Sequence, residues 1–97
     1  MISVEVDGED YVVLSGIRQA LGGRMVAVVE LNVDGLFITD GAEDIRDSIM
    51  EKYREFMNML AKQDVAVEAA VMAVAKEGGM DVIRIKAPAK TVWVLYK

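Results

Sequence analysis

Apolar and polar residues alternate over residues 2–7, with the two-residue period of a half-buried strand. From Val13 to Leu21 the apolar residues instead share one helical face, and Gly22-Gly23 supplies a helix stop. The pattern equally allows a second strand over residues 11–14, followed by a shorter helix that Ser15 caps. The chain is therefore expected to begin with a strand and a short helix.

A β-hairpin is predicted next. Residues 25–31 form a nearly unbroken apolar run with three valines, which is typical of a central strand. Val33-Asp34-Gly35 is a hairpin turn signal, and residues 36–39 supply the returning strand.

A long helical pattern covers residues 42–77, with Asp40 predicted as its N-cap and Glu43 as the capping-box partner. Its apolar stripe steps by four and three residues through Ile49, Tyr53, Phe56, Leu60, Gln63, Val67, Ala70 and Val74. One unbroken helix would be ~54 Å long, whereas a compact domain of this size is only ~30 Å across. Such a helix must protrude, pack on a second copy or bend. A break that Asp64 caps is the alternative, and the sequence leaves both open.

The last third of the chain predicts an apolar helical segment and a second hairpin. Residues 65–75 are apolar nearly all round, so this segment must be enclosed by its own domain or by another chain. Gly78-Gly79 ends it, and strands over 80–86 and 91–96 follow. The final strand is apolar on both faces, yet its place at the end of the chain also makes it a candidate edge.

This order of elements predicts a single α+β domain over residues 1–97. We expect an antiparallel sheet of about five strands packed on one long helix or a helix pair, plus a short N-terminal helix.

The composition of the chain excludes several common kinds of catalytic site. The chain has no Cys and no His, which excludes thiol nucleophiles, thiolate metal sites and a Ser-His-Asp triad. We expect no catalytic residue, no cofactor and no metal. The net charge of −5 opposes binding to a phosphate backbone. Basic residues nevertheless gather near the C-terminus, where Arg84, Lys86, Lys90 and Lys97 stand against Asp81 alone.

Three clusters carry weaker signals for a site. The acidic loop with Asp7, Glu9 and Asp10 could hold a hard cation, although turn formation explains it better. Glu30-x-Asn32-x-Asp34-Gly35 resembles half a calcium loop, but Gly41 stands where its closing acid should be. Trp93 and Tyr96 lie beside the basic strand, which is the basis for a nucleic-acid alternative.

The order of elements resembles the roadblock / dynein light chain family. The segments that carry the resemblance are the apolar strand 26–31, Asp34-Gly35, the strand 36–38, the Ala- and Met-rich helical region, and the closing strands 81–85 and 91–95. The resemblance covers roughly residues 12–97 and is one of pattern. It implies dimers formed through the long helix and a sheet edge, with scaffolding or small-GTPase regulation and no catalytic residue. A second resemblance, of residues 2–22 alone, is to the start of phage antirepressor N-terminal domains, which bind or regulate DNA.

These observations favour a non-catalytic protein–protein interaction or scaffold module, homodimeric through its apolar helix, that could regulate a partner. The alternatives are a nucleic-acid-linked regulator that uses the basic C-terminal hairpin and a small Mg²⁺-dependent enzyme with an acidic site. We expect a cytoplasmic location and no membrane span, because the longest apolar stretch is far below ~20 residues. The residues expected at the interface are Tyr53, Phe56, Leu60, Val67, Val71, Val74 and Trp93.

Overall fold

The structure is a computed structural model that describes residues 2–5 and 10–97, with side chains from Ser15 onward. Within these ranges the chain forms, in order, β1 (Ile2–Glu5), α1 (Asp10–Leu21), a 3₁₀ turn η1 (Gly22–Arg24), β2 (Met25–Asn32), β3 (Gly35–Asp40), α2 (Glu43–Leu60), α3 (Gln63–Glu77), β4 (Asp81–Ala87) and β5 (Lys90–Tyr96). The predicted α+β class is therefore confirmed.

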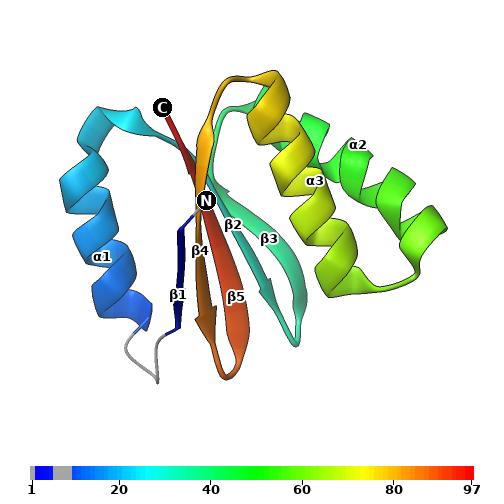
Figure 1. The fold of residues 1–97 in the computed structure, drawn as a ribbon, viewed down its shortest axis with the longest axis horizontal. Coiled ribbons are helices and arrows are strands. Elements are labelled where there is room, and N and C mark those ends of the chain that lie inside the picture. The colour runs from blue at the N-terminus through cyan, green and yellow to red at the C-terminus, as the bar shows by residue number, and fades with distance from the viewer. Residues whose placement is uncertain (1, 6–9) are drawn as a thin grey trace.

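The sheet has the strand order β1-β4-β5-β2-β3. The four strands from β4 to β3 are antiparallel as predicted, whereas β1 joins the edge in parallel with β4. α1 covers one face, and α2 and α3 cover the other (Figure 1). The last strand is not the edge that its place at the end of the chain allowed: β5 pairs with β4 on one side and with β2 on the other. Its central position explains why both of its faces are apolar.

The short N-terminal helix α1 runs to the predicted stop. Gly22 has φ = 54°, a left-handed conformation that glycine adopts without steric cost. The alternative of a second strand over residues 11–14 is wrong, because those residues belong to α1.

The predicted capping box at the start of α2 is also wrong. α2 begins at Glu43 with Ala42 as its N-cap, and no side chain caps it. Asp40 instead ends β3 and forms an ion pair with Arg18 of α1. Gly41, between Asp40 and Ala42, has φ = 151°, and a Cβ at this position would lie 3.2 Å from the Cβ of Ala27. The chain therefore leaves the sheet before the helix can begin.

The helical region 42–77 is two helices. α2 ends at Leu60, and its C-cap Ala61 is left-handed with φ = 55° and ψ = 18°. The extended residue Lys62 precedes α3, and no side chain caps that helix either. The break thus lies just before Gln63, and Asp64 is part of the first turn of α3 rather than its cap.

The core has two parts, one on each face of the sheet. The larger part joins α2 and α3 to the sheet, and Trp93 is its largest fully buried residue. The smaller part comprises Val28, Ile85, Val92 and Val94, against which Ile17 and Leu21 of α1 pack. Adjacent residues of β5 thus belong to opposite cores, which is the two-residue period of a strand covered on both faces.

Candidate functional site

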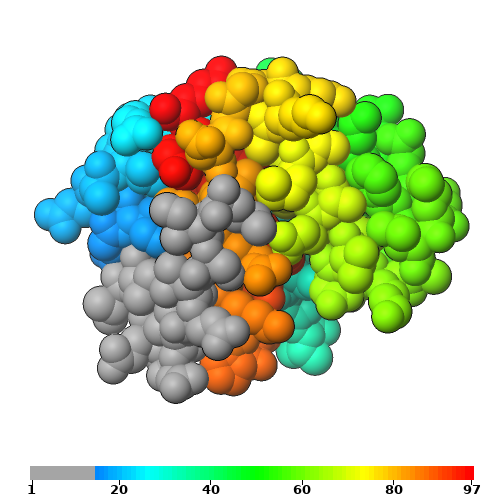
Figure 2. All heavy atoms as spheres, viewed as in Figure 1, coloured from blue at the N-terminus to red at the C-terminus, as the bar shows by residue number. Residues whose placement is uncertain are grey.

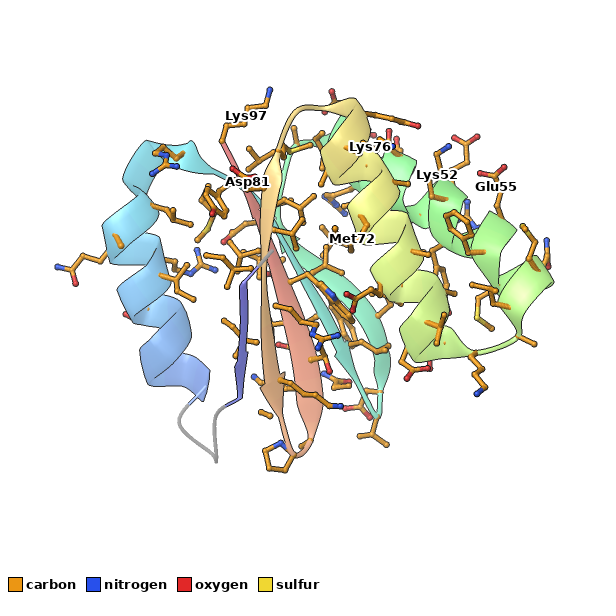
Figure 3. All side chains as sticks on the ribbon, in the orientation of Figure 1. Lys52, Glu55, Met72, Lys76, Asp81 and Lys97 are labelled. Atoms are coloured by element: carbon orange, nitrogen blue, oxygen red, sulfur yellow. The ribbon has the colours of Figure 1, made fainter. Side chains whose placement is uncertain are left out.

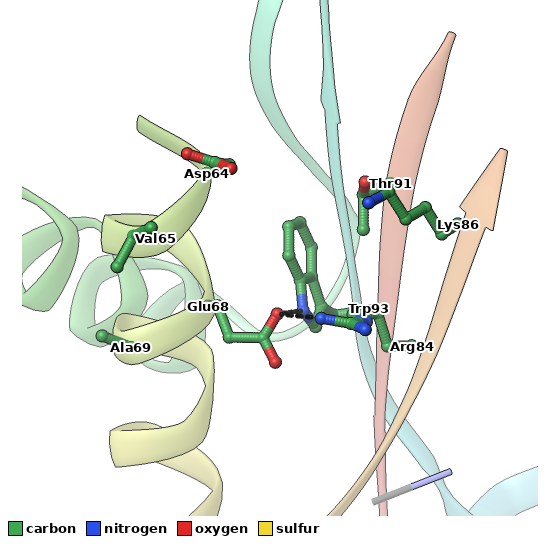
Figure 4. A pocket seen from close by; sticks show the side chains of 8 residues that line it. All are labelled: Asp64, Val65, Glu68, Ala69, Arg84, Lys86, Thr91 and Trp93. Atoms are coloured by element: carbon green, nitrogen blue, oxygen red, sulfur yellow. Dashed lines mark hydrogen bonds and ion pairs between the residues drawn. The ribbon is translucent and has the colours of Figure 1, made fainter. Parts of the chain in front are cut away.

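A mixed polar cluster lies between α3 and the sheet. Glu68 is the one charged residue in the apolar stretch 65–75, and its side chain points from α3 toward the strands. Its Oε2 accepts a hydrogen bond from Trp93 Nε1 at 3.1 Å and lies 3.1 Å from Arg84 Nη1 (Figure 4). The carboxylate therefore satisfies the only polar group of an otherwise buried indole.

The strands place these partners by their register. Arg84 of β4 lies opposite Trp93 of β5, and the next pair on the same face is Lys86 and Thr91. Because side chains alternate along a strand, Ile85 between the two cations belongs to the opposite core. The two basic residues of β4 consequently face α3.

These residues line an open groove of about 420 Å³, together with Asp64, Val65 and Ala69 of α3. One wall of the groove is helical, with Val65 and Ala69 as its apolar part, and the floor and other wall come from β4 and β5 (Figure 4). Two acidic and two basic side chains line it, so the groove has no excess of either charge.

Two of the charged side chains that line the groove are paired with each other. Glu68 is engaged by two donors, and the cation of Arg84 is paired with it. Among the residues that line the groove, Thr91 supplies the one hydroxyl, and Lys86 lies opposite it in the strand register.

Exposed apolar side chains gather at the α2–α3 turn, beside the groove. Met59 is 74% exposed, Leu60 42% and Val65 43%, and Phe56 is half-buried. We call Phe56, Met59, Leu60 and Val65 the turn patch. Val65 also lines the groove, so the two surfaces are continuous. This end of the helix pair lies at the surface, at the lower right of Figure 2.

The structure divides the seven residues predicted for an interface. Leu60 is exposed, and Tyr53 and Phe56 are half-buried. The other four are buried in the core when the chain is alone: Val67, Val71, Val74 and Trp93. The sequence stripe thus combined core positions of α3 with surface positions of α2.

Met59 and Val65 are not among the residues predicted for the interface, because they lie beside the apolar helical stripe and not on it. Their signal in the sequence was the apolar density around residues 56–65, which is high for a segment that turns. Glu68 was missed as a binding partner for Trp93, although it alone interrupts an apolar run.

The two aromatic residues of the nucleic-acid alternative face opposite ways. Trp93 is only 1% exposed, so it presents no ring face to a base. Tyr96 is half-buried, and the guanidinium of Arg24 lies 5.3 Å from its ring centroid. They do not form one stacking platform.

The proposed acidic loop contains Asp7 and Glu9, which lie outside the described residues, and Asp10, whose side chain does too. In the part of the chain that is described, acidic residues form no group of three that could hold a metal ion. Nor does any described helix have the length and apolar character to cross a membrane.

Comparison with protein-family models, curated proteins and solved structures finds no match to this chain.

Proposed function

We propose that this chain is a non-catalytic protein–protein interaction module that forms homodimers through the helical region around the α2–α3 turn. The observation that carries the proposal is the turn patch, where apolar side chains remain exposed although the chain has a well-formed core. A contiguous exposed apolar surface marks an interaction site more often than isolated apolar residues do.

The charges around the patch favour a second copy as the partner. Residues 54–64 contain Arg54 and Lys62 against Glu55 and Asp64, all of them exposed. The chain as a whole carries −5, so two copies repel each other on average. The turn patch is a neutral region in which a two-fold contact can pair unlike charges around an apolar centre.

Leu60→Asp is expected to weaken self-association at least tenfold while the monomer stays folded. Leu60 is exposed in one chain, so the new carboxylate is solvated in the monomer but desolvated in the dimer. Size exclusion with light scattering, at micromolar concentration and in low and high salt, measures the effect against twice the chain mass of 10.7 kDa. High salt should leave the wild-type dimer intact, because its centre is apolar.

Val33→Asp is the matched control. Val33 is 95% exposed at the tip of the β2–β3 hairpin, so this variant makes the same kind of substitution away from the patch. It should dimerise like the wild type. A wild-type chain that is monomeric throughout this range, or a Leu60→Asp variant that dimerises as well as Val33→Asp, contradicts the proposal.

A further inference from the structure

The turn between α2 and α3 is built from residues that favour a helix. The stretch Met59–Asp64 contains neither Gly nor Pro, although the chain uses Gly at its other helix ends. Ala61 holds a left-handed conformation that residues other than Gly, Asn and Asp rarely adopt. No side chain caps either helix at this turn. The bend is therefore disfavoured by its own sequence.

The same residues fit a straight helix. The apolar stripe runs through the turn without a change of phase, from Tyr53, Phe56 and Leu60 to Val67. If Ala61 and Lys62 became helical, the amides of residues 62–65 would donate to the carbonyls of residues 58–61. α2 and α3 would then form one helix from Glu43 to Glu77, about 52 Å long.

We propose that the homodimer is domain-swapped: the α2–α3 turn straightens, and the arm α3–β4–β5 packs on the body of a second copy. This inference rests on the proposed self-association and specifies how it occurs. Domain swapping recreates, between two chains, the contacts that the arm makes with the body in the monomer, so the turn and any new contact decide the balance at a given protein concentration.

The topology permits the exchange. In one chain β4 and β5 lie between β1 and β2, and α3 packs on α2. The ion pair of Lys52 on α2 with Glu77 on α3, at 3.4 Å, also joins body and arm. In the swapped dimer the partner's arm makes each of these contacts. The groove moves intact, because all of its lining residues lie between Asp64 and Trp93.

In the swapped dimer the turn patch is covered by the second copy. The midpoint of residues 43–77 is residue 60, so two antiparallel straight helices cross near Leu60. Met59 and Leu60 of each copy then meet the same residues of the other near the two-fold axis, and Phe56 of each copy lies opposite residues 64–65 of the other. The side chains that are exposed in the monomer become the new contact that favours the dimer.

Gln63→Pro is the decisive variant. Gln63 is the first residue of α3, where proline is favoured, and Lys62 before it has φ = −125° and ψ = 119°, as a residue before proline prefers. The bent monomer thus accepts the change. In the straight helix, proline at 63 removes an amide donor and clashes with the carbonyl of residue 59. The dimerisation constant should fall at least a hundredfold, with Gln63→Ala as the unchanged control.

Substitutions at Ala61 should act in opposite directions. Ala61→Gly favours the left-handed turn and disfavours the helix, so it should lower the dimerisation constant about tenfold or more. Ala61→Val disfavours the turn, because a β-branched residue is strained at positive φ, and should raise the constant about tenfold. Each chain is refolded from denaturant at low and at high concentration, and the masses are measured by light scattering.

A disulfide distinguishes a swapped dimer from a surface dimer. Asn32 of β2 lies opposite Lys90 of β5, and the natural chain has no cysteine. The variant Asn32→Cys with Lys90→Cys can therefore form one bond, within a chain in the monomer and between chains in the swapped dimer. The dimer fraction, oxidised and run on a non-reducing denaturing gel, should migrate as a covalent dimer.

Three results are informative. A covalent dimer that Gln63→Pro abolishes supports the proposal. A dimer whose disulfide stays within each chain, or one that Gln63→Pro forms as well as Gln63→Ala does, overturns the swap and leaves the proposed homodimer standing. Monomers at every refolding concentration, in the wild type and in Ala61→Val, overturn both.

Discussion

Glu68 shows how one polar residue completes an apolar interface between helix and sheet. Its carboxylate lies partly at the surface and accepts the indole N–H of Trp93, while Arg84 balances its charge. A buried indole N–H without an acceptor would lose its hydrogen bond to water and gain nothing in return. The charged residue in α3 is therefore required by the aromatic residue in β5.

We expect Glu68→Ala to lower the free energy of unfolding by about 1–3 kcal/mol, because it leaves the Trp93 N–H without its acceptor. Urea unfolding followed by fluorescence measures the change. Glu55→Ala, at an exposed position of α2, is the control and should stay within about 0.5 kcal/mol of the wild type (Figure 3). Equal stabilities of the two variants would show that the hydrogen bond contributes nothing.

At the scale of elements, α3 is a core helix with one exposed side. Ala66, Val67, Ala70, Val71, Val74 and Ala75 are buried in it. Val65 and Met72 are exposed. An apolar residue at the surface of α3 is thus the direct neighbour in sequence of one in the core. The helix does not reveal its exposed side by polarity, since both sides are apolar.

Val67→Asp and Val65→Asp form a matched pair on this helix. The carboxylate at 67 would be buried without a partner, so we expect a loss of about 4 kcal/mol or more, or an unfolded chain. The carboxylate at 65 is exposed near the start of α3, where a negative charge is favourable, so stability should change by less than about 1 kcal/mol. Circular dichroism melts at a concentration where the chains are monomeric compare the two.

The whole molecule joins its two cores through β5. Trp93 and Leu95 belong to the core under α2 and α3, and Val92 and Val94 to the core under α1. Because both cores include side chains of β5, neither core can unfold without removing the strand on which the other core packs. The domain should therefore unfold as one cooperative unit.

This cooperativity is testable with the single tryptophan. Trp93 fluorescence reports on one core, and far-ultraviolet circular dichroism reports on all helices. Their urea transitions should coincide in midpoint and slope. Two separated transitions would instead show that the α1 side unfolds by itself, and that residues 1–97 are not one folding unit.

The sequence by itself determined the elements and most of their bounds. The apolar run of β2, the Asp34-Gly35 turn and the paired glycines after α1 and α3 are local signals, and each acts where it stands in the chain. The α+β class follows from their order. The apolar stripe through Phe56 and Leu60 is also a local signal, and the assignment of these residues to an interface stays a prediction.

Tertiary structure decided what depends on distant residues. β5 is central because β2 and β4 pair with it from opposite sides, and Asp40 ends β3 and pairs with Arg18 instead of capping α2. The stripe across Gln63 did not reveal the bend, since a helix and a helical hairpin share its period. The bend forms because folding α3 back buries Val67, Val71 and Val74 against the sheet, and this burial outweighs the left-handed strain at Ala61.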